Sequence, residues 1–370
     1  MKKKNVALFY NKLLGNFGGM EIHGDNFINY FNNNNQYNLK VIISKKENLN
    51  YAIIGNKVHL INLETKCKEL EEIDIFFFNS GHWISQIELL HNNYKTTKFI
   101  YRTGGNEIIK APLKNVLKHK ERQKYWVKII NNYIDAIITN SEYSEKRLSN
   151  LGISAKLFQR NVGGVNVGLI RAIKNNSIIE NSAKTKFVCA SRFVHYKNHD
   201  KLISVFKKLN NLNIDFELIL IGDGQLYENI KKESLNLVKL KKVQFKGIMS
   251  NEDVLNEIIK ADYYIQFSSE YKVEVENGFY IHAEGMGRSI LEAISCHTFV
   301  ITTNSGALAE IVNDNNGILV NLDNEEQIVQ QIKKLINNKI INTELIDDKY
   351  SWELFFNKYV SLFEKLDPNE

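Results

Sequence analysis

Residues that interrupt or cross-link a chain are scarce in this sequence. Its 370 residues include two prolines, Pro112 and Pro368, and three cysteines. Cys67, Cys189 and Cys296 lie far apart and match no metal-ligand spacing, which excludes a disulfide-rich scaffold or a zinc module. Because Cys189 and Cys296 stand inside apolar runs, we expect reduced thiols in a protein core.

Long apolar segments are also missing. No stretch approaches the roughly 20 apolar residues that a membrane-spanning helix requires. The apolar run Val6–Tyr10 is too short for the core of a signal peptide and predicts a β-strand instead. We therefore expect a soluble, cytoplasmic protein. With 44% apolar residues over this length, the composition predicts two α/β domains rather than one.

Positive charge is concentrated in the first half of the sequence. Residues 1–180 contain 26 lysines and arginines against 15 acidic residues, a net charge of +11, and the remainder contains 22 against 27, a net charge of −5. Partners respond to such local fields more than to the total charge. We expect the first half to meet an anionic partner, although no recognisable nucleic-acid-binding module accompanies the charge.

Short β-branched or aromatic runs alternate with stretches of helical period, which is typical of parallel βαβ units. A polar stretch, Arg171–Lys186, separates two such series. We predict Rossmann-like domains at 1–170 and 171–348, and an amphipathic helix at 349–370 that packs back on the first domain. The predicted strands are Asn5–Tyr10, Leu39–Ser44, Ile73–Phe78, Lys98–Tyr101, Asp135–Thr139, Phe187–Ala190, Phe216–Ile221, Val243–Lys246, Tyr263–Phe267 and Phe299–Thr302.

Two loops that follow predicted strands carry candidate phosphate-binding residues. Gly15–Glu21 follows the first strand, and its glycines would let backbone N–H groups at a helix start approach a phosphate. In Ala190–Asp200, Arg192 and Lys197 offer a planar fork and a point charge suited to a diphosphate. The alternatives are a plain turn and solvated surface cations. His195 and His199 lack a third metal ligand.

The strongest motif is His282–Ala293, in which Glu284 and Glu292 stand eight positions apart across a glycine-containing turn and a helix. Up to two helical turns separate the carboxylates, so the pair spans roughly ten ångströms. That span suits a sugar at one end of a sugar nucleotide and a ribose at the other. Glu292 faces apolar neighbours, where an ionised carboxylate needs a partner such as ribose hydroxyls.

Together these motifs resemble glycosyltransferase family 4, whose members adopt the GT-B fold and include glycogen synthases, sucrose-phosphate synthases and phosphatidylinositol mannosyltransferases. The resemblance covers nearly the whole chain. It rests on Gly18–Glu21, Ile138–Ser144, Asn161–Asn166, Arg192 with Lys197, Ile221–Gly224, Phe245–Ile248, Glu284–Glu292 and Asn304–Ile311.

The resemblance implies a retaining, metal-independent hexosyltransferase in which two Rossmann-like domains face each other across a cleft. Arg192 and Lys197 would clamp the donor diphosphate, so neither a cofactor nor a metal is expected. Glu284 would hold hydroxyls of the transferred sugar, and Glu292 would hold the ribose. Further donor contacts are implied for Gly18, Gly19, Ile248, Met286, Gly287, Arg288 and Ser289. The partners would be a nucleotide sugar carrying UDP or GDP and a glycan or lipid-linked acceptor, in the synthesis of cell-surface polysaccharide or glycoconjugates.

Two segments depart from the family pattern. Many relatives carry a histidine near the sugar in the first domain, where this chain has Arg102, so Arg102 is a candidate for the sugar or acceptor. His82 is a second candidate, with a structural hydrogen bonder as its alternative. A polar stretch, Glu270–Ile281, precedes Glu284, and we predict a lid or an acceptor-side loop there.

A row of basic residues, Lys110, Lys114, Lys118 and Arg122, recurs at helical spacing. Such a row is either the solvated face of a helix or a peripheral contact with an anionic membrane surface. Two other functions for the whole chain also stay open. One is a sugar-nucleotide epimerase of the same fold, and the other is a non-catalytic subunit that binds sugar nucleotides.

Overall fold

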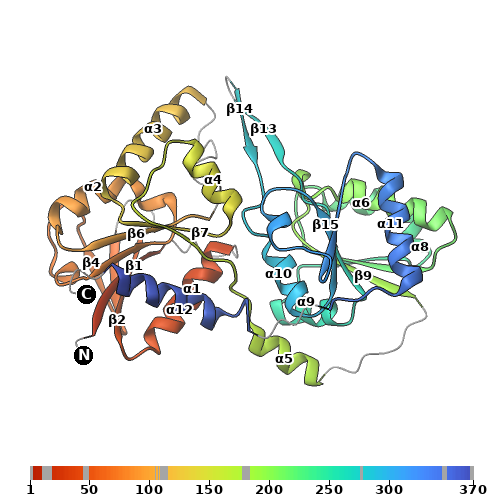
Figure 1. Ribbon diagram of the computed structural model, residues 1–370, viewed down its shortest axis with the longest axis horizontal. Helices are drawn as coiled ribbons and strands as arrows, with labels where there is room; N and C mark the ends of the chain where they lie inside the picture. The colour runs from red at the N-terminus through yellow and green to blue at the C-terminus, as the bar shows by residue number, and fades with distance from the viewer. Residues whose placement is uncertain are drawn as a thin grey trace. The chain divides into compact units, whose positions relative to one another are not determined.

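The computed structural model describes residues 3–10, 19–44, 50–104, 106, 108, 116–176, 184–275, 278–343 and 348–366. The chain divides into two compact units (Figure 1). The first unit comprises Met1–Val162, Lys272–Ile281 and Trp352–Glu370, and the second comprises Gly163–Tyr271 and His282–Ser351.

The first unit is built on a sheet with the strand order β4-β3-β2-β1-β5-β6-β7-β8 among the described residues. Its centre, from β2 through β1 to β8, is parallel, whereas β3 and β4 add an antiparallel edge. All five strands predicted for this half are present. The strands are β1 Lys4–Tyr10, β2 Tyr37–Ser44, β3 Asn50–Ile54, β4 Lys57–Ile61, β5 Ile75–Phe78, β6 Lys98–Arg102, β7 Ala136–Thr139 and β8 Phe158–Arg160.

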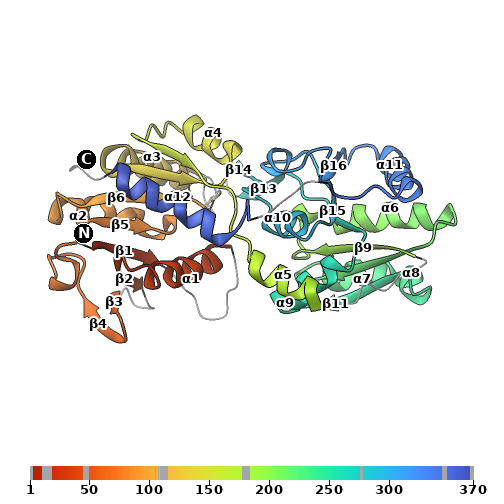
Figure 2. The ribbon, with the colours of Figure 1, turned by 60° about the horizontal axis from the view of Figure 1, so that its bottom comes forward.

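Helices cover both faces of this sheet because its central strands are apolar on both sides (Figure 2). One face packs against α1 and α12, and the other packs against α2 and α3. The helices are α1 Gly19–Asn32, α2 Ile84–Asn93, α3 Val116–Tyr133, α4 Glu142–Asn150 and α12 Trp352–Lys365.

The predicted return of the C-terminal helix to the first domain is confirmed. On α12, Phe356 and Tyr359 are fully buried against Phe27 of α1 and Phe77 of β5. The amide of Asn161, just after β8, donates a 2.9 Å hydrogen bond to the Phe355 carbonyl. These contacts make α12 part of the core of the first unit.

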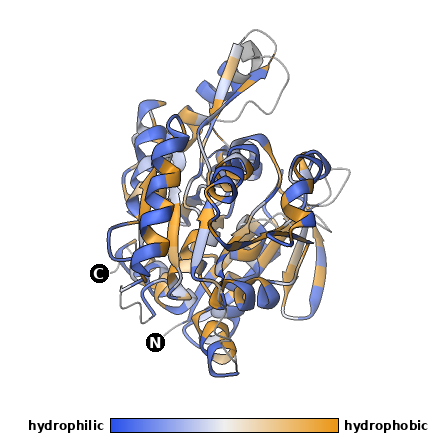
Figure 3. Cartoon of the chain, turned by 90° about the vertical axis from the view of Figure 1, so that its right-hand side faces the viewer, coloured by the Kyte–Doolittle hydropathy of each residue, from blue (hydrophilic) through white to orange (hydrophobic). Residues whose placement is uncertain are grey.

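The second unit contains a parallel sheet with the strand order β11-β10-β9-β12-β15-β16. All five strands predicted for this half are present, and β16 is an addition. Figure 3 shows the apolar strands in orange and the polar outer turns of the helices in blue. The strands are β9 Thr185–Ala190, β10 Phe216–Ile221, β11 Val243–Gly247, β12 Tyr263–Gln266, β15 Phe299–Thr303 and β16 Gly317–Val320.

The helices of the second unit follow its strands in the expected βα alternation. They are α5 Val167–Asn176, α6 His199–Asn211, α7 Tyr227–Glu233, α8 Leu235–Lys239, α9 Asn251–Ile259, α10 Arg288–Ser295 and α11 Glu325–Asn338. The unit begins before the predicted boundary at residue 171, because the N–H groups of Gly164 and Val165 both lie 2.9 Å from the Tyr350 carbonyl. The structure thus has two α/β units, each with a parallel sheet, as predicted.

The polar stretch before Glu284 forms a two-stranded sheet of β13 (Tyr271–Val275) and β14 (Gly278–His282). Phe279 of β14 is exposed, and Lys272 Nζ of β13 lies 4.4 Å from its ring centre. The sequence predicted a lid or an acceptor-side loop at this place. The structure shows two paired strands here, and a role as a lid or on the acceptor side stays a prediction.

Candidate functional site

The loop that carries Arg192 and Lys197 links β9 to α6 and is held by the neighbouring loop after β10. The N–H of Ser191 donates to the Ile221 carbonyl, and the N–H of Phe193 donates to the Asp223 carbonyl, both at 3.0 Å. Gly222 has a φ of +125°, and a Cβ there would lie 2.2 Å from the Ser191 carbonyl oxygen. Only glycine permits this approach, so the glycine motif after β10 supports the cationic loop.

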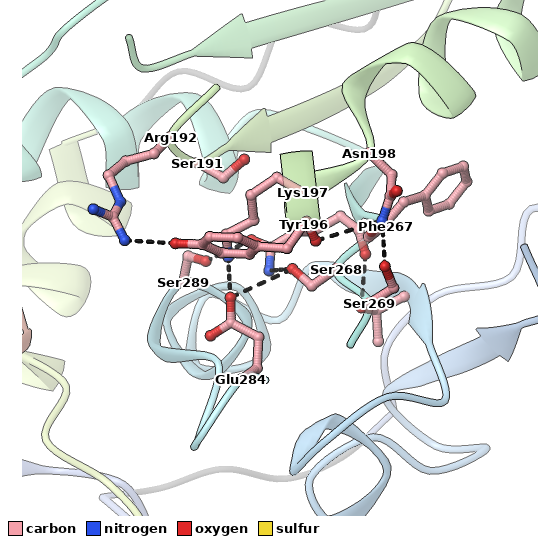
Figure 4. Close-up of polar contacts among 12 residues, drawn as sticks. Ser191, Arg192, Tyr196, Lys197, Asn198, Phe267, Ser268, Ser269, Glu284 and Ser289 are labelled. Atoms are coloured by element: carbon pink, nitrogen blue, oxygen red, sulfur yellow. Dashed lines mark hydrogen bonds and ion pairs between the residues drawn. The ribbon is translucent and has the colours of Figure 1, made fainter. Parts of the chain in front are cut away.

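Lys197 and Glu284 form an ion pair in this unit (Figure 4). Their side chains are only 11% and 19% exposed. Burial is the largest single effect and raises the pKa of Glu284. The charge and hydrogen bond of Lys197, together with the charges of His282 and Arg192, outweigh burial, so the pKa lies below its ordinary value. Glu284 is therefore an ionised acceptor of hydrogen bonds at neutral pH.

Arg192 is exposed, and its Nη2 donates a 2.6 Å hydrogen bond to the Tyr196 hydroxyl. In the part of the chain that the structure describes, no carboxylate forms an ion pair with Arg192. The Tyr196 ring also lies 4.1 Å from the ring of His282, at the end of β14, and 5.8 Å from Lys197 Nζ. Tyr196 thus lies among three cationic or titratable side chains and fixes the direction of Arg192.

A buried polar network lies beneath the carboxylate of Glu284. Ser268 Oγ donates a 3.5 Å hydrogen bond to Glu284 Oε1 and accepts a 2.8 Å bond from Gln266 Nε2. Gln266 Oε1 in turn accepts bonds from Tyr264 at 3.1 Å and from Ser289 at 2.9 Å. These side chains come from the end of β12 and the first turn of α10, so the sheet itself orients Glu284 and Ser289.

The backbone around Glu284 is fixed by the segment that follows β15. The Ala307 N–H donates a 3.1 Å hydrogen bond to the Glu284 carbonyl. Gly306 has a φ of +57°, and a Cβ there would lie 2.5 Å from the same carbonyl oxygen. The motif Asn304–Ile311 therefore contributes through its backbone and through the absence of a side chain at Gly306.

Glu292 lies on α10 and is buried, with 7% of its surface exposed. Its Oε1 accepts hydrogen bonds from Arg288 Nε at 3.2 Å and from Asn251 Nδ2 at 3.3 Å. The sequence analysis suggested ribose hydroxyls as the partner that this buried carboxylate needs. The structure supplies protein partners for Oε1, so a ribose contact would use Oε2.

The remaining predicted donor residues of this unit follow two strands. Met286 and Gly287 lead into α10, and Gly287 has a φ of +75° with its Cα facing Leu308 so closely that a Cβ would clash at 2.5 Å. Ile248 follows β11 and is 80% exposed, which is unusual for a large aliphatic side chain.

The two histidines at helical spacing have different partners. His199 is buried, stacks on Phe193 with ring centres 4.1 Å apart, and bonds to Ser191 Oγ through Nε2 at 3.1 Å. Burial, and then the charge of Lys197, lower its pKa to about 3, so it is neutral. His195 instead stacks on Tyr271 at 5.6 Å. The pair therefore does not converge on a common ligand.

In the first unit, the structure places Arg102 at the end of β6 and His82 in a short 3-10 helix after β5. Arg102 is buried, and its Nη1 lies 3.2 Å from Asn79 Oδ1. His82 is exposed and lies edge-on against Trp83 at 5.2 Å. Gly19 begins α1, and no atom of the described residues lies within 4 Å of where its Cβ would stand; Gly18 lies outside the described residues.

The basic row of the first half is only partly described. Lys110 and Lys114 lie outside the described residues, as does the side chain of Lys118. Arg122 lies on α3 with its guanidinium 5.7 Å from the ring centre of Trp126. No helix within the described ranges has the length and apolar character needed to cross a membrane.

A groove of about 500 Å³ lies elsewhere on the first unit, between α1 and α12. It contains none of the predicted site residues. Its lining consists of asparagine side chains, aromatic rings and one acid: Asn26, Asn29, Tyr30, Asn33, Asn34, Asn35, Trp352, Glu353 and Phe356.

The structure thus brings Arg192, Lys197, Glu284 and Ser289 into one connected set of contacts, with Glu292 further along α10. Their roles in binding stay predictions. The sequence analysis missed the residues that orient this set, chiefly Tyr196, Gln266, Ser268, His282 and Asn251. The signal for Tyr196 was its position between Arg192 and Lys197, and the signal for Ser268 was its position at the end of an apolar strand.

Comparison with known proteins gives concordant matches. Residues 171–352 match the family described as glycosyl transferases group 1. An uncharacterized glycosyltransferase of Methanocaldococcus jannaschii is 24% identical over 98% of this chain and 94% of the relative. The GDP-mannose-dependent monoacylated alpha-(1-6)-phosphatidylinositol monomannoside mannosyltransferase of Corynebacterium glutamicum is 21% identical over 79% of this chain and 77% of the relative. The crystal structure of Anabaena HepE in complex with UDP and glucose matches 97% of this chain and 99% of that chain, with a TM-score of 0.68 and 16% identity.

Proposed function

Because the chain is a GT4-like glycosyltransferase with the GT-B fold, we propose that it moves a hexose-type sugar from a nucleotide diphosphate to an acceptor hydroxyl with retention of configuration. The observation that carries this proposal is the Lys197–Glu284 ion pair beside Arg192. Lys197 and Arg192 are the two cations of this arrangement, and Glu284 is its ionised carboxylate.

The cations match the charge that develops on the leaving group. When the bond between the anomeric carbon and the phosphate oxygen breaks, its electron pair moves to that oxygen. Lys197 and Arg192 would stabilise the developing negative charge, which is the contribution that a divalent ion makes in other transferases. This is the basis for proposing a metal-independent reaction.

Glu284 is suited to holding the sugar rather than attacking it. Its Oε1 is already engaged by Lys197 and Ser268, so it is a poor nucleophile and a firm acceptor for sugar hydroxyls. The acceptor hydroxyl would attack the anomeric carbon from the face that the diphosphate leaves, and would pass its proton to the departing phosphate oxygen. This route retains configuration without a covalent enzyme intermediate.

The acceptor and the location follow as parts of the same proposal. We propose a glycan or a lipid-linked acceptor, in cytoplasmic synthesis of cell-surface polysaccharide or glycoconjugates. The Corynebacterium relative is named for a lipid acceptor and the Anabaena structure contains UDP and glucose, which supports these classes. The row of basic residues in the sequence, Lys110, Lys114, Lys118 and Arg122, is the reason for including a peripheral position at the membrane in this proposal.

The test is release of free nucleotide diphosphate from UDP-, GDP- and ADP-sugars in the presence of a panel of glycan and glycolipid acceptors. We expect one nucleotide to be used, and Glu284→Ala to abolish transfer. Lys208→Ala is the matched control, because Lys208 pairs with Glu325 and Glu326 on the surface, away from this site. NMR of the product would show the anomeric configuration. Conversion of a donor without any acceptor would instead identify an epimerase, and full turnover by the Glu284→Ala variant would refute the assigned role.

A further inference from the structure

Arg102 has surroundings unlike those of the other buried cations. Arg102 is 7% exposed. Its Nη1 contacts two neutral atoms, Asn79 Oδ1 at 3.2 Å and Met20 Sδ at 3.1 Å. Within the described ranges no carboxylate forms an ion pair with it. By contrast, Lys186, Lys197 and Arg288 are less enclosed, and each has a glutamate partner.

The Tyr359 phenol near Arg102 does not supply the missing negative charge. Burial raises the pKa of Tyr359 well above its ordinary value, and the guanidinium and Asn161 only partly oppose this. The hydroxyl is neutral and lies 2.9 Å from His23 Nε2. The guanidinium cannot lose its proton at any ordinary pH. Among the residues that the structure describes, Arg102 is therefore a permanent charge that is largely removed from water without a counter-ion.

Burying such a charge costs several kcal/mol unless a partner compensates. An apolar or neutral residue at the end of β6 would avoid that cost. Residues that lower the stability of the fold without a compensating contact in the protein occur mainly at functional sites. The surroundings of Arg102 therefore indicate that a ligand supplies the negative charge.

The position of Arg102 in the sheet supports the same conclusion. It ends β6, Asn79 follows the adjacent β5, and Met20 lies in the first turn of α1, which follows β1. The strand order reverses at β1, since β2 lies on one side of it and β5 on the other. Ligands of open parallel sheets bind at the carboxyl ends of the strands beside such a reversal.

Asn79 orients the guanidinium of Arg102. Its Nδ2 donates a 3.1 Å hydrogen bond to the Met20 carbonyl, which turns its Oδ1 toward Arg102. The residue is 2% exposed, so its amide has little freedom. Holding Nη1 in this way orients the planar guanidinium. The Tyr359 hydroxyl is a further partner of the guanidinium. The N–H groups that these contacts do not use suit the oxygens of a phosphate.

We propose that Arg102 binds a phosphate group of the acceptor. This inference rests on the proposed function, because it assigns the first unit to the acceptor. The net charge of +11 on residues 1–180 agrees with an anionic ligand there. The phosphate belongs to a soluble sugar phosphate or to the head group of a lipid, and both present the same chemistry to Arg102.

The test uses the full chain saturated with UDP or GDP, whichever it binds, so that the donor diphosphate subsite is filled. Methyl phosphate is then titrated and its binding followed by NMR of the ligand. We expect Arg102→Met to weaken this binding about tenfold or more, and Arg102→Lys to weaken it less. Lys98→Met is the matched control, because Lys98 lies at the opposite end of the same strand and should leave binding unchanged.

Thermal unfolding separates a ligand site from a structural role. We expect Arg102→Met to keep or raise Tm, since it removes an uncompensated charge. Unchanged affinity for methyl phosphate in Arg102→Met, or no phosphate binding by the wild type, would overturn the proposal. If Arg102→Met does not fold, Arg102→Gln, which keeps a donor for Asn79, decides by the same titration. A chain that binds neither nucleotide would instead contradict the proposed function.

Two further arms identify the source of the phosphate. Competition by glucose 6-phosphate that depends on Arg102 would indicate a soluble sugar phosphate. Sedimentation with phosphatidylcholine vesicles that requires added phosphatidic acid, and that Arg102→Met reduces, would indicate a lipid. Either result supports the phosphate subsite, and failure of both in a protein that binds methyl phosphate would exclude the acceptor as the source.

Discussion

Lys197, in the loop after β9, and Glu284, after β14, are 87 positions apart in the sequence and form an ion pair. The pair joins the loop that follows β9 to the turn that precedes α10. It therefore ties together the two motifs on which the proposed donor site depends. Breaking it should affect the stability of the second unit as well as catalysis.

Single and double substitutions at this pair should be non-additive. Lys197→Met leaves a largely buried carboxylate uncompensated, and Glu284→Gln leaves a buried ammonium, so each should lower the free energy of unfolding. The double variant should lose less than the sum of the two, with a coupling energy of about 1–3 kcal/mol. Denaturant unfolding of the four proteins measures this coupling, and simple additivity would show that the pair contributes little.

The acid limb of activity should move when Lys197 is replaced. The pKa of Glu284 lies below its ordinary value of 4.5, so the carboxylate stays ionised, and its stabilising effect is lost only as pH falls through this lowered pKa. In Lys197→Met, burial should dominate and raise the pKa. We expect kcat/KM of the wild type to show no loss from Glu284 above pH 4.5, and the residual activity of the variant to fall at higher pH. Coincident acid limbs in the two proteins would contradict this.

His199 should make stability depend on pH. Its pKa is about 3 in the folded protein against 6.5 as the ordinary value, so below pH 6.5 the unfolded chain binds the proton more readily. Stability from the neutral ring is complete above pH 6.5 and is lost as pH falls toward 3, by up to about 1.4 kcal/mol per pH unit. His199→Phe, which keeps an aromatic ring against Phe193, should reduce the slope of unfolding free energy between pH 6 and about 4. An unchanged slope would assign the dependence to other groups.

Gly222 should be far less tolerant of a side chain than Gly247. Both have positive φ, but a Cβ at Gly222 meets the Ser191 carbonyl at 2.2 Å, whereas no atom of the described residues lies within 4 Å of one at Gly247. Gly247→Ala should cost about 1 kcal/mol from backbone strain alone. Gly222→Ala should cost several times more and displace the cationic loop, which weakens nucleotide binding. Equal unfolding free energies of the two variants would show that the loop after β9 moves aside freely.

The central strands were predictable from sequence because they are buried on both faces. Runs such as Ile75–Phe78 are apolar at every position, and this pattern distinguishes a parallel core strand. The strands β3 and β4 were missed because they are short and partly exposed, as at Val58 and Leu60. Their pairing is set by the adjacent β2, which the local pattern does not reveal.

The charged members of the candidate site were predictable because cations and carboxylates follow strands at recognisable spacing. The neutral residues that orient them were not. Gln266 and Tyr264 alternate with apolar residues in β12 and have no distinctive spacing. Asn251 reaches Glu292 from 41 positions away, so only the folded sheet shows that contact. The partners of Arg102 are distant as well, since Met20 precedes it by 82 positions.

The position of α12 has a consequence for how the protein is made. The aromatic side chains of residues 352–365 cover one face of the first sheet, whose strands β1 to β8, between Lys4 and Arg160, are all translated before the second unit. The ribosome therefore synthesises the whole second unit before α12 can pack against Phe27, Phe31 and Phe77. Until α12 is synthesised, this apolar face of the first sheet stays exposed on the nascent chain, where chaperones that recognise apolar surface can bind it.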